Sequence, residues 1–188
     1  MRRQALFLPA WLKPSAAVDI AQVHFAIRPV LRTETRRNIS ASEVQRWARQ
    51  RGWFAHFDDR FVAFSPFPEL GRRVLALDRS ALDHTYLLGL ALAYPACCSR
   101  AAARNGESVL DDLGASIGAA RFIGRFSAIN PSGYLAGRAL ISHIPCSPHC
   151  APSLDMAETL IRALKITPAI LRRGLPQFRA AFSQCRSR

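Results

Sequence analysis

Four of the five cysteines in this 188-residue chain fall in two short segments, and this pairing constrains the fold more than any other sequence feature. Residues 94–98 read Tyr-Pro-Ala-Cys-Cys, and residues 143–150 read His-Ile-Pro-Cys-Ser-Pro-His-Cys. The prolines mark both segments as loops or helix starts. We therefore predict that the two segments meet in space and form one metal site, with Cys97, Cys98, Cys146 and Cys150 as its ligands.

Thiolate sulfur is a soft donor that suits zinc, copper(I) and iron–sulfur clusters. Pro95 and Pro152 each predict a helix start beside a cysteine pair, where free backbone N–H groups and the helix dipole stabilise thiolates. Because neighbouring side chains diverge, Cys97 and Cys98 fit a cluster, in which they reach different irons, better than a single ion. An iron–sulfur cluster is therefore the favoured cofactor, with zinc or copper as the alternative.

Two other interpretations of these cysteines stay open. In the first, only one of Cys97 and Cys98 binds metal, the other is a free redox thiol, and His143 or His149 completes a mixed site. In the second, the cysteines are ordinary buried small residues. Cys185 lies in a polar tail, and we treat it as incidental.

The two segments resemble those of an uncharacterised prokaryotic family, a domain of unknown function with Tyr-Pro-x-Cys-Cys and His-x-Pro-Cys-Ser-x-x-Cys-x-x-Ser motifs. Residues 94–98 and 143–153 carry these motifs, and the similarity covers roughly residues 85–165. The resemblance implies one shared site, with Tyr94, His143 and Ser153 beside the cysteines. It implies no particular reaction.

The sequence predicts an α+β fold with a small α+β unit in residues 1–78. Alternating apolar residues predict a strand within residues 18–30, and polar residues 32–38 predict a loop. A capping box at Ser40 predicts a helix. Two further patterns predict a hairpin over residues 53–64 and a strand over 74–77. We expect this unit, with three or four strands and one helix, to recognise a substrate or partner.

Residues 79–188 predict a mainly helical, metal-binding domain. The strongly apolar residues 82–93 predict a helix that is buried on most sides. Further helices are expected to begin at Pro95, over 108–120, 134–141 and 152–165, and after Thr167 and Pro176.

The formal net charge of +13 comes almost wholly from arginine and favours an anionic small molecule, a peptide or an acidic protein as partner. Nucleic acid is a weaker alternative, because the arginine pairs are scattered. No apolar run reaches the length of a membrane span. The N-terminus faintly resembles a signal peptide but is broken by Pro9 and Lys13, so we expect a cytoplasmic protein.

These features favour a metalloenzyme that carries out redox, sulfur-transfer or tailoring chemistry at the cysteine site. His143 or Tyr94 would act as proton donor or orient the substrate, and Arg138 would pair with a substrate anion. The alternative function is a structural zinc module in an interaction or nucleic-acid-binding protein. A thiol redox protein with a reversible disulfide between the segments is a third interpretation. We find no phosphate-binding loop and no metalloprotease or hydrolase motif.

Overall fold

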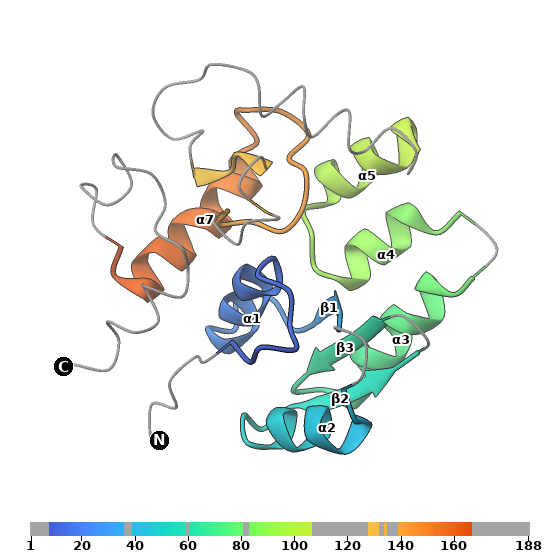
Figure 1. The fold of residues 1–188 in the computed structure, drawn as a ribbon. Coiled ribbons are helices and arrows are strands. Elements are labelled where there is room, and N and C mark those ends of the chain that lie inside the picture. The colour runs from blue at the N-terminus through green and yellow to red at the C-terminus, as the bar shows by residue number, and fades with distance from the viewer. Residues whose placement is uncertain are drawn as a thin grey trace.

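The computed structural model describes residues 8–35, 39–58, 61–80, 83–106, 128–131, 134 and 139–166. Within these residues, helices surround a three-stranded antiparallel sheet, which confirms the predicted α+β class (Figure 1). The elements in chain order are α1 (Ala16–His24), β1 (Leu31–Glu34), α2 (Ala41–Arg49), β2 (Phe54–Phe57), β3 (Phe61–Ser65), α3 (Pro68–Asp78), α4 (Thr85–Ala91), α5 (Ala96–Asn105) and α7 (Ala151–Leu164).

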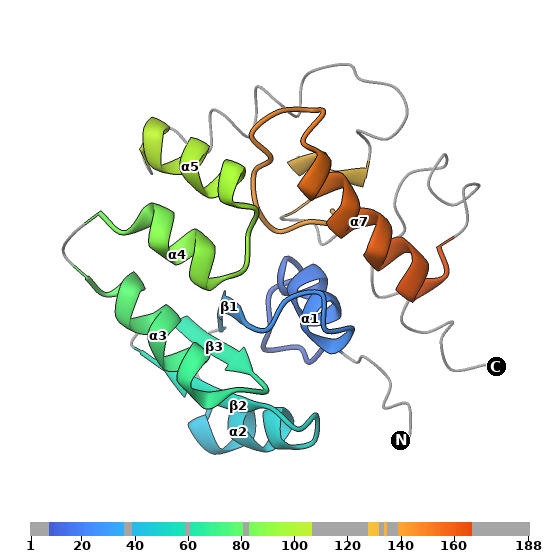
Figure 2. The same ribbon diagram turned by 180° about the vertical axis from the view of Figure 1, so that it is seen from behind.

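The central strand is β3, because the order across the sheet is β1-β3-β2 and both neighbours run antiparallel to it. Its side chains alternate between two hydrophobic clusters, as expected for a strand that is covered on both faces. Val62 and Phe64 enter the larger cluster together with residues of α1 and α2. Ala63 enters the smaller cluster with Val74 and Leu75 of α3, which lies across the sheet in Figure 2.

The strand predicted within residues 18–30 is wrong, because this segment forms α1. All eight residues from Ala16 to Val23 are buried, so the helix has no polar face that could reveal a helical period in the sequence. The apolar alternation that suggested a strand runs past the end of the helix, which is capped by Phe25. The first strand is instead Leu31–Glu34, most of which falls in the loop that the sequence predicted over residues 32–38.

The strand predicted at residues 74–77 is also wrong, because these residues lie inside α3. Pro68 occupies the first turn of this helix, where its missing N–H group has no helical partner to lose. Val74 and Leu75 are buried against the sheet. A short apolar run does not distinguish a strand from one buried side of a helix, which explains the error.

The prediction that the helix within residues 82–93 is buried on most sides is also wrong, because only Gly89 of α4 is buried and Leu87 and Leu90 are exposed. Several other local signals were interpreted correctly. The predicted hairpin is formed by β2 and β3. The backbone N–H of Glu43 donates to the Ser40 hydroxyl at 3.2 Å and caps α2. Helix α5 follows directly after Pro95 and α7 has a proline in its first turn, as the sequence predicted.

Some predicted elements lie outside the described residues: the helices over 108–120, after Thr167 and after Pro176, and residues 135–138 of the helix predicted over 134–141. The described residues 139–141 of that last segment are not helical. In the part of the chain that the structure describes, no helix combines the length and apolar character needed to cross a membrane.

The larger hydrophobic cluster draws on both halves of the chain. Leu12 and Phe64 belong to it, and so do Leu140 and Leu160. The division into residues 1–78 and 79–188 stays a prediction. The consequence for the cysteine site is that α7 and the residues before the second cysteine segment are packed against the same core as α1. Tyr94 of the first segment packs against the smaller cluster instead.

Helices α4 and α5 pack closely at Gly89. A Cβ atom at this position would lie 2.4 Å from the Ser99 Oγ and 2.8 Å from its Cβ. We therefore expect Gly89→Ala to destabilise the protein by about 1–3 kcal/mol, because the two helices must separate. Thermal unfolding of the variant checks this value. Adding Ser99→Gly should restore part of the loss, and an unchanged midpoint in the single variant would contradict the packing.

Candidate metal centre

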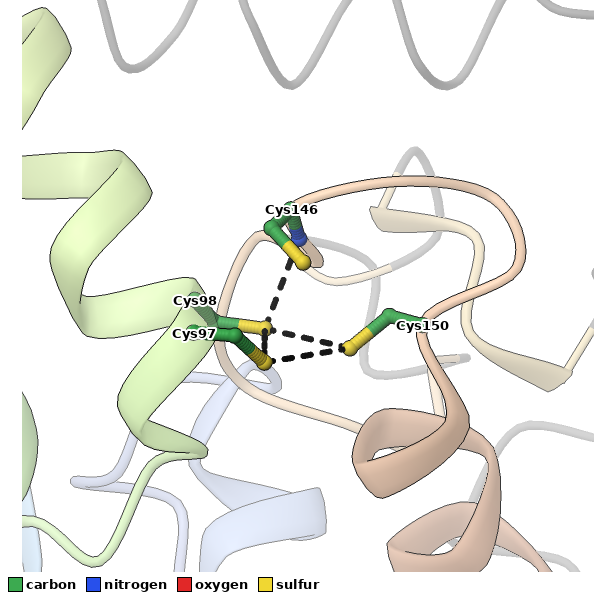
Figure 3. Close-up of side chains that lie close together, drawn as sticks. All are labelled: Cys97, Cys98, Cys146 and Cys150. Carbon is green, nitrogen blue, oxygen red and sulfur yellow. Dashed lines mark hydrogen bonds between the residues drawn. The ribbon is translucent and has the colours of Figure 1, made fainter.

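The four cysteines of the two segments lie together. Cys97 and Cys98 stand in the first turn of α5, Cys150 caps the N-terminus of α7, and Cys146 lies in the loop that leads to it. Figure 3 shows the four side chains pointing toward one another. All four sulfur atoms lie within 4.8 Å of one another, so this group can hold a metal ion. The predicted meeting of the two segments is confirmed.

The separations between the sulfur atoms are short. The Sγ atom of Cys150 lies 3.5 Å from that of Cys98 and 3.6 Å from that of Cys97. The Sγ atoms of Cys97 and Cys98 are 3.9 Å apart, so these neighbouring side chains converge rather than diverge as we expected. A tetrahedral ion with metal–sulfur bonds of about 2.3 Å holds its sulfurs about 3.8 Å apart. The observed spacings are close to that value.

Backbone groups and two helix starts surround the sulfurs. The N–H of Cys146 donates to the Cys98 Sγ at 3.4 Å. Helices α5 and α7 both begin at the cluster, as Figure 3 shows, so the positive ends of their dipoles face the thiols. Both features stabilise negatively charged sulfur, as a thiolate metal site requires.

The Ser153 side chain joins two of the cysteines to His143. Its fully buried hydroxyl donates to the Cys150 Sγ at 3.2 Å and lies 3.4 Å from the Cys98 Sγ. Burial alone would raise the pKa of Cys150, but hydrogen bonds from the Ser153 hydroxyl and backbone N–H lower that pKa to about 7. Burial raises the pKa of Cys98, and it raises that of Cys146 to about 11. Of these three thiols, Cys150 therefore ionises most readily.

His143 is a neutral imidazole of defined tautomer. Burial and then the nearby charge of Arg28 lower its pKa to about 3. Its Nε2 lies 2.8 Å from the Ser153 Oγ. Since the Ser153 hydroxyl gives its proton to sulfur, it must accept from a protonated Nε2, which leaves Nδ1 as an acceptor. Nδ1 is buried and has no hydrogen-bond partner among the described residues.

A buried arginine supports this side of the site. The Arg28 guanidinium donates to Asp19 at 2.6 Å and to the Leu92 carbonyl at 2.7 Å, and it also donates to the Ser142 hydroxyl. Its Cζ lies 4.5 Å from the centre of the Tyr94 ring. These contacts tie α1 to both cysteine segments. Sequence reasoning missed Arg28 and Asp19; the one available signal was an acidic residue inside an apolar segment.

A cavity of about 320 Å³ opens beside the cluster, and we call it the Cys98 cavity. Cys98, Tyr94 and His143 are among its walls, with Arg32 and Asp78 also lining it. Apolar side chains supply much of the remaining wall, among them Leu88, Leu92, Ala102 and Ile144. A molecule in this space would touch a cysteine of the cluster.

The structure brings together most of the predicted site residues. Tyr94 and His143 lie against each other with ring centres 5.1 Å apart, next to the cysteines. Among the described residues, the group that could hold a metal ion consists of the four cysteines and contains no histidine. The alternative mixed site, with His143 or His149 as a ligand, is therefore not formed. Arg138 and Cys185 lie outside the described residues.

Comparisons with known proteins add no assignment. No family model, curated protein or solved structure matches this chain. The site must therefore be interpreted from its own geometry.

The loss of the Ser153 hydroxyl is expected to weaken metal binding. Ser153→Ala removes the hydrogen bonds to Cys150 and Cys98 and should lower metal affinity about 10–100-fold, as outer hydrogen-bonding partners of metal ligands typically do. Competition with a chromophoric chelator measures the change. Thr159→Ala removes an exposed hydroxyl from the same helix and is the matched control. Equal affinities in the two variants would contradict this role.

Proposed function

We propose that this protein is a metal-dependent enzyme whose four thiolates hold one ion beside the substrate cavity. The observation that carries the proposal is the shared wall: Cys98 belongs to the cysteine cluster and also lines the Cys98 cavity. A substrate in the cavity would lie next to a metal-bound sulfur. His143 and Tyr94 line the same space and would orient the substrate.

One ion fits the sulfur positions better than the iron–sulfur cluster expected from the sequence. A cluster places several irons and sulfides between its cysteines, so their sulfurs stand farther apart than those that share one ion. The 3.5–3.9 Å separations among Cys97, Cys98 and Cys150 suit four ligands around a single centre. Zinc and iron are the ions that favour tetrahedral sulfur ligands, and zinc is our first choice.

The reaction class follows from the identity of the ion. A zinc-bound thiolate stays unprotonated at neutral pH and would serve sulfur-centred group transfer or tailoring of the substrate. Iron in the same position would serve one-electron redox chemistry. A reducing compartment such as the cytoplasm, which the sequence led us to expect, would keep these four cysteines available as metal ligands. Membership of the uncharacterised prokaryotic family remains part of this proposal.

Metal analysis of the anaerobically purified chain is the first test. We expect about one equivalent of zinc or iron per chain and no acid-labile sulfide. Cobalt substitution should give intense sulfur-to-cobalt charge-transfer absorption with the visible bands of a tetrahedral site. Several irons per chain with stoichiometric sulfide would instead support the iron–sulfur cluster expected from the sequence. The absence of any bound metal would refute the proposal.

The enzymatic part needs a separate test. The metal-loaded protein is incubated with a small-molecule extract of bacterial cells, and substrate loss and product gain are followed by mass spectrometry. The matched control is Cys150→Ser protein treated identically. We expect at least one compound to be converted by the loaded protein and not by the control. If the loaded protein and the control leave the same set of compounds unchanged across repeated extracts, the proposed enzymatic activity is refuted.

A structural zinc module is the second candidate function. All four metal positions would be filled by protein sulfur, and structural zinc sites usually have such closed shells. The positive net charge would then serve binding to a polyanion. Stoichiometric zinc, steeply salt-dependent binding to nucleic acid and no substrate conversion would favour this function over the enzyme.

A further inference from the structure

The cysteine cluster combines exposed and buried thiols. Cys97 and Cys146 are exposed, whereas Cys98 and Cys150 are only 2% and 5% exposed. The susceptibility of a thiol to oxidants depends on its access to solvent. A small oxidant in solution therefore reaches the sulfurs of Cys97 and Cys146 before it reaches the two buried ones.

A buried sulfur lies directly beside the exposed sulfur of Cys97. The Cys150 Sγ is 3.6 Å away from it, and in Figure 3 these two sulfurs and that of Cys98 form a triangle. An S–S bond is about 2.05 Å long, so the sulfurs of Cys97 and Cys150 must approach each other by about 1.5 Å to form one. Such a bond would join the first turn of α5 to the residue that caps α7.

Cys98 is the other neighbour of the Cys97 sulfur, at 3.9 Å, but it is a poor disulfide partner. Consecutive residues joined by a trans peptide bond have Cα atoms about 3.8 Å apart. Disulfides usually need Cα atoms about 4.4–6.8 Å apart, so a bond between these two cysteines would be strained. Cys150 comes from a different helix and has no such constraint.

We propose that Cys97 is an oxidation site for peroxides and that Cys150 is its resolving thiol. In the first step, the Cys97 thiolate attacks hydrogen peroxide, the O–O bond breaks, and hydroxide is released as Cys97 becomes a sulfenic acid. In the second step, the Cys150 thiolate attacks the Cys97 sulfur, so the S–S bond forms, the S–O bond breaks and a second hydroxide leaves. The hydroxides take up the two thiol protons, and one peroxide is reduced to two waters.

This oxidation would regulate the metal centre. The disulfide withdraws two of the four sulfurs that can hold an ion, and the remaining thiols of Cys98 and Cys146 do not complete a tetrahedral site. The regulatory role rests on the proposed function, because it acts through release of the ion. Formation of the disulfide requires the sulfurs alone. A dithiol reductant would restore both thiols and the capacity to bind metal.

Peptide mapping of the natural full-length protein tests the pair. The metal-free chain is treated with hydrogen peroxide, alkylated and digested with trypsin. Cleavage after arginine leaves Cys97 and Cys98 in one peptide and Cys146 and Cys150 in another, so fragmentation in the mass spectrometer must locate the link within each. We expect a link between Cys97 and Cys150. A main product without a link, or with a link between any other two cysteines, would overturn the inference.

Two double variants test why Cys97 is the site of attack. Cys98→Ser with Cys146→Ser keeps Cys97 and Cys150, whereas Cys97→Ser with Cys146→Ser keeps Cys98 and Cys150. The sulfurs of the second pair are equally close, at 3.5 Å, but both are buried. We expect the first variant to form its disulfide with hydrogen peroxide at least about tenfold faster than the second. Equal rates would contradict the role of the exposed thiol.

Metal content separates this inference from the proposed function. A chain that binds no metal refutes the proposed function, while its disulfide can still form. A chain that binds one ion but never links Cys97 to Cys150, with or without the ion, refutes this inference alone. In the metal-loaded protein, we expect peroxide to release the ion in step with the disulfide, as followed with a chromophoric indicator. Full retention of the ion by the disulfide-linked protein would refute the regulatory role.

Discussion

The Cys150→Ser protein is expected to bind its metal at least about 100-fold more weakly than the natural protein. The Cys150 sulfur lies within 3.6 Å of two other cluster sulfurs, and its thiol has the lowest pKa of those that are shifted, about 7. Thiolate sites of this type bind zinc with about 10–16 kcal/mol, so one ligand of four contributes roughly 3 kcal/mol. A factor of about 100 corresponds to that energy.

Chelator competition and elemental analysis measure this loss. Cys185→Ser is the matched control, because this cysteine belongs to neither of the two cysteine motifs. We expect that control to keep its metal, and at least two of Cys97→Ser, Cys98→Ser and Cys146→Ser to lose theirs. Full metal content in the Cys150→Ser protein would refute the four-thiolate site.

Arg28→Met is expected to lower the free energy of unfolding by about 3–5 kcal/mol. The Arg28 side chain is fully buried and pairs with Asp19, which is only 3% exposed. Removing the cation leaves a buried carboxylate without its counterion, and such a loss typically has this magnitude. The carbonyl of Leu92 and the hydroxyl of Ser142 also lose a donor. Urea denaturation of the metal-loaded protein measures the effect.

A double variant distinguishes the ion pair from general packing damage. Arg28→Met combined with Asp19→Asn removes both charges and should recover part of the lost stability. Arg32→Met breaks a more exposed ion pair with Asp78 and should cost about 1 kcal/mol or less. If Arg28→Met were no more damaging than Arg32→Met, the buried pair would not support the fold as described.

Sequence patterns predicted the cysteine site because its signals are local. Pro95 lies shortly before Cys97, and Pro152 lies shortly after Cys150. These two prolines fix where α5 and α7 begin. Two helix starts, one with Cys97 and Cys98 in its first turn and one preceded by Cys146 and Cys150, are hard to explain except by a shared site. The resemblance and the proline positions together also pointed to Tyr94, His143 and Ser153, all of which lie beside the sulfurs.

The arrangement within the site could not be predicted in the same way. We expected the side chains of Cys97 and Cys98 to diverge because they are neighbours, although the sequence placed both at a helix start. In a helix, adjacent side chains are only about 100° apart, so both sulfurs can turn to one side. Their 3.9 Å separation follows from their place in the first turn of α5.

The burial of α1 on all sides explains why the sequence predicted neither this helix nor the role of Arg28, which follows it. A helix without an exposed face has no hydrophobic period, so its apolar residues were mistaken for a strand. Arg28 lies four residues beyond the end of α1, and only the folded chain brings it against Tyr94. Pairing over such distances depends on packing that no short sequence window contains.

The buried arginine sets a limit on how far this centre can be transplanted. A designer who grafts only residues 94–98 and 143–153 onto another scaffold would carry over the sulfurs and Ser153. The graft would lack Asp19 and Arg28, which come from the opposite end of the chain and hold Tyr94 and Ser142 in place. A faithful copy therefore requires α1 and the residues up to Arg28 as well, and a minimal version built from the motifs alone should bind metal in a loosely ordered loop.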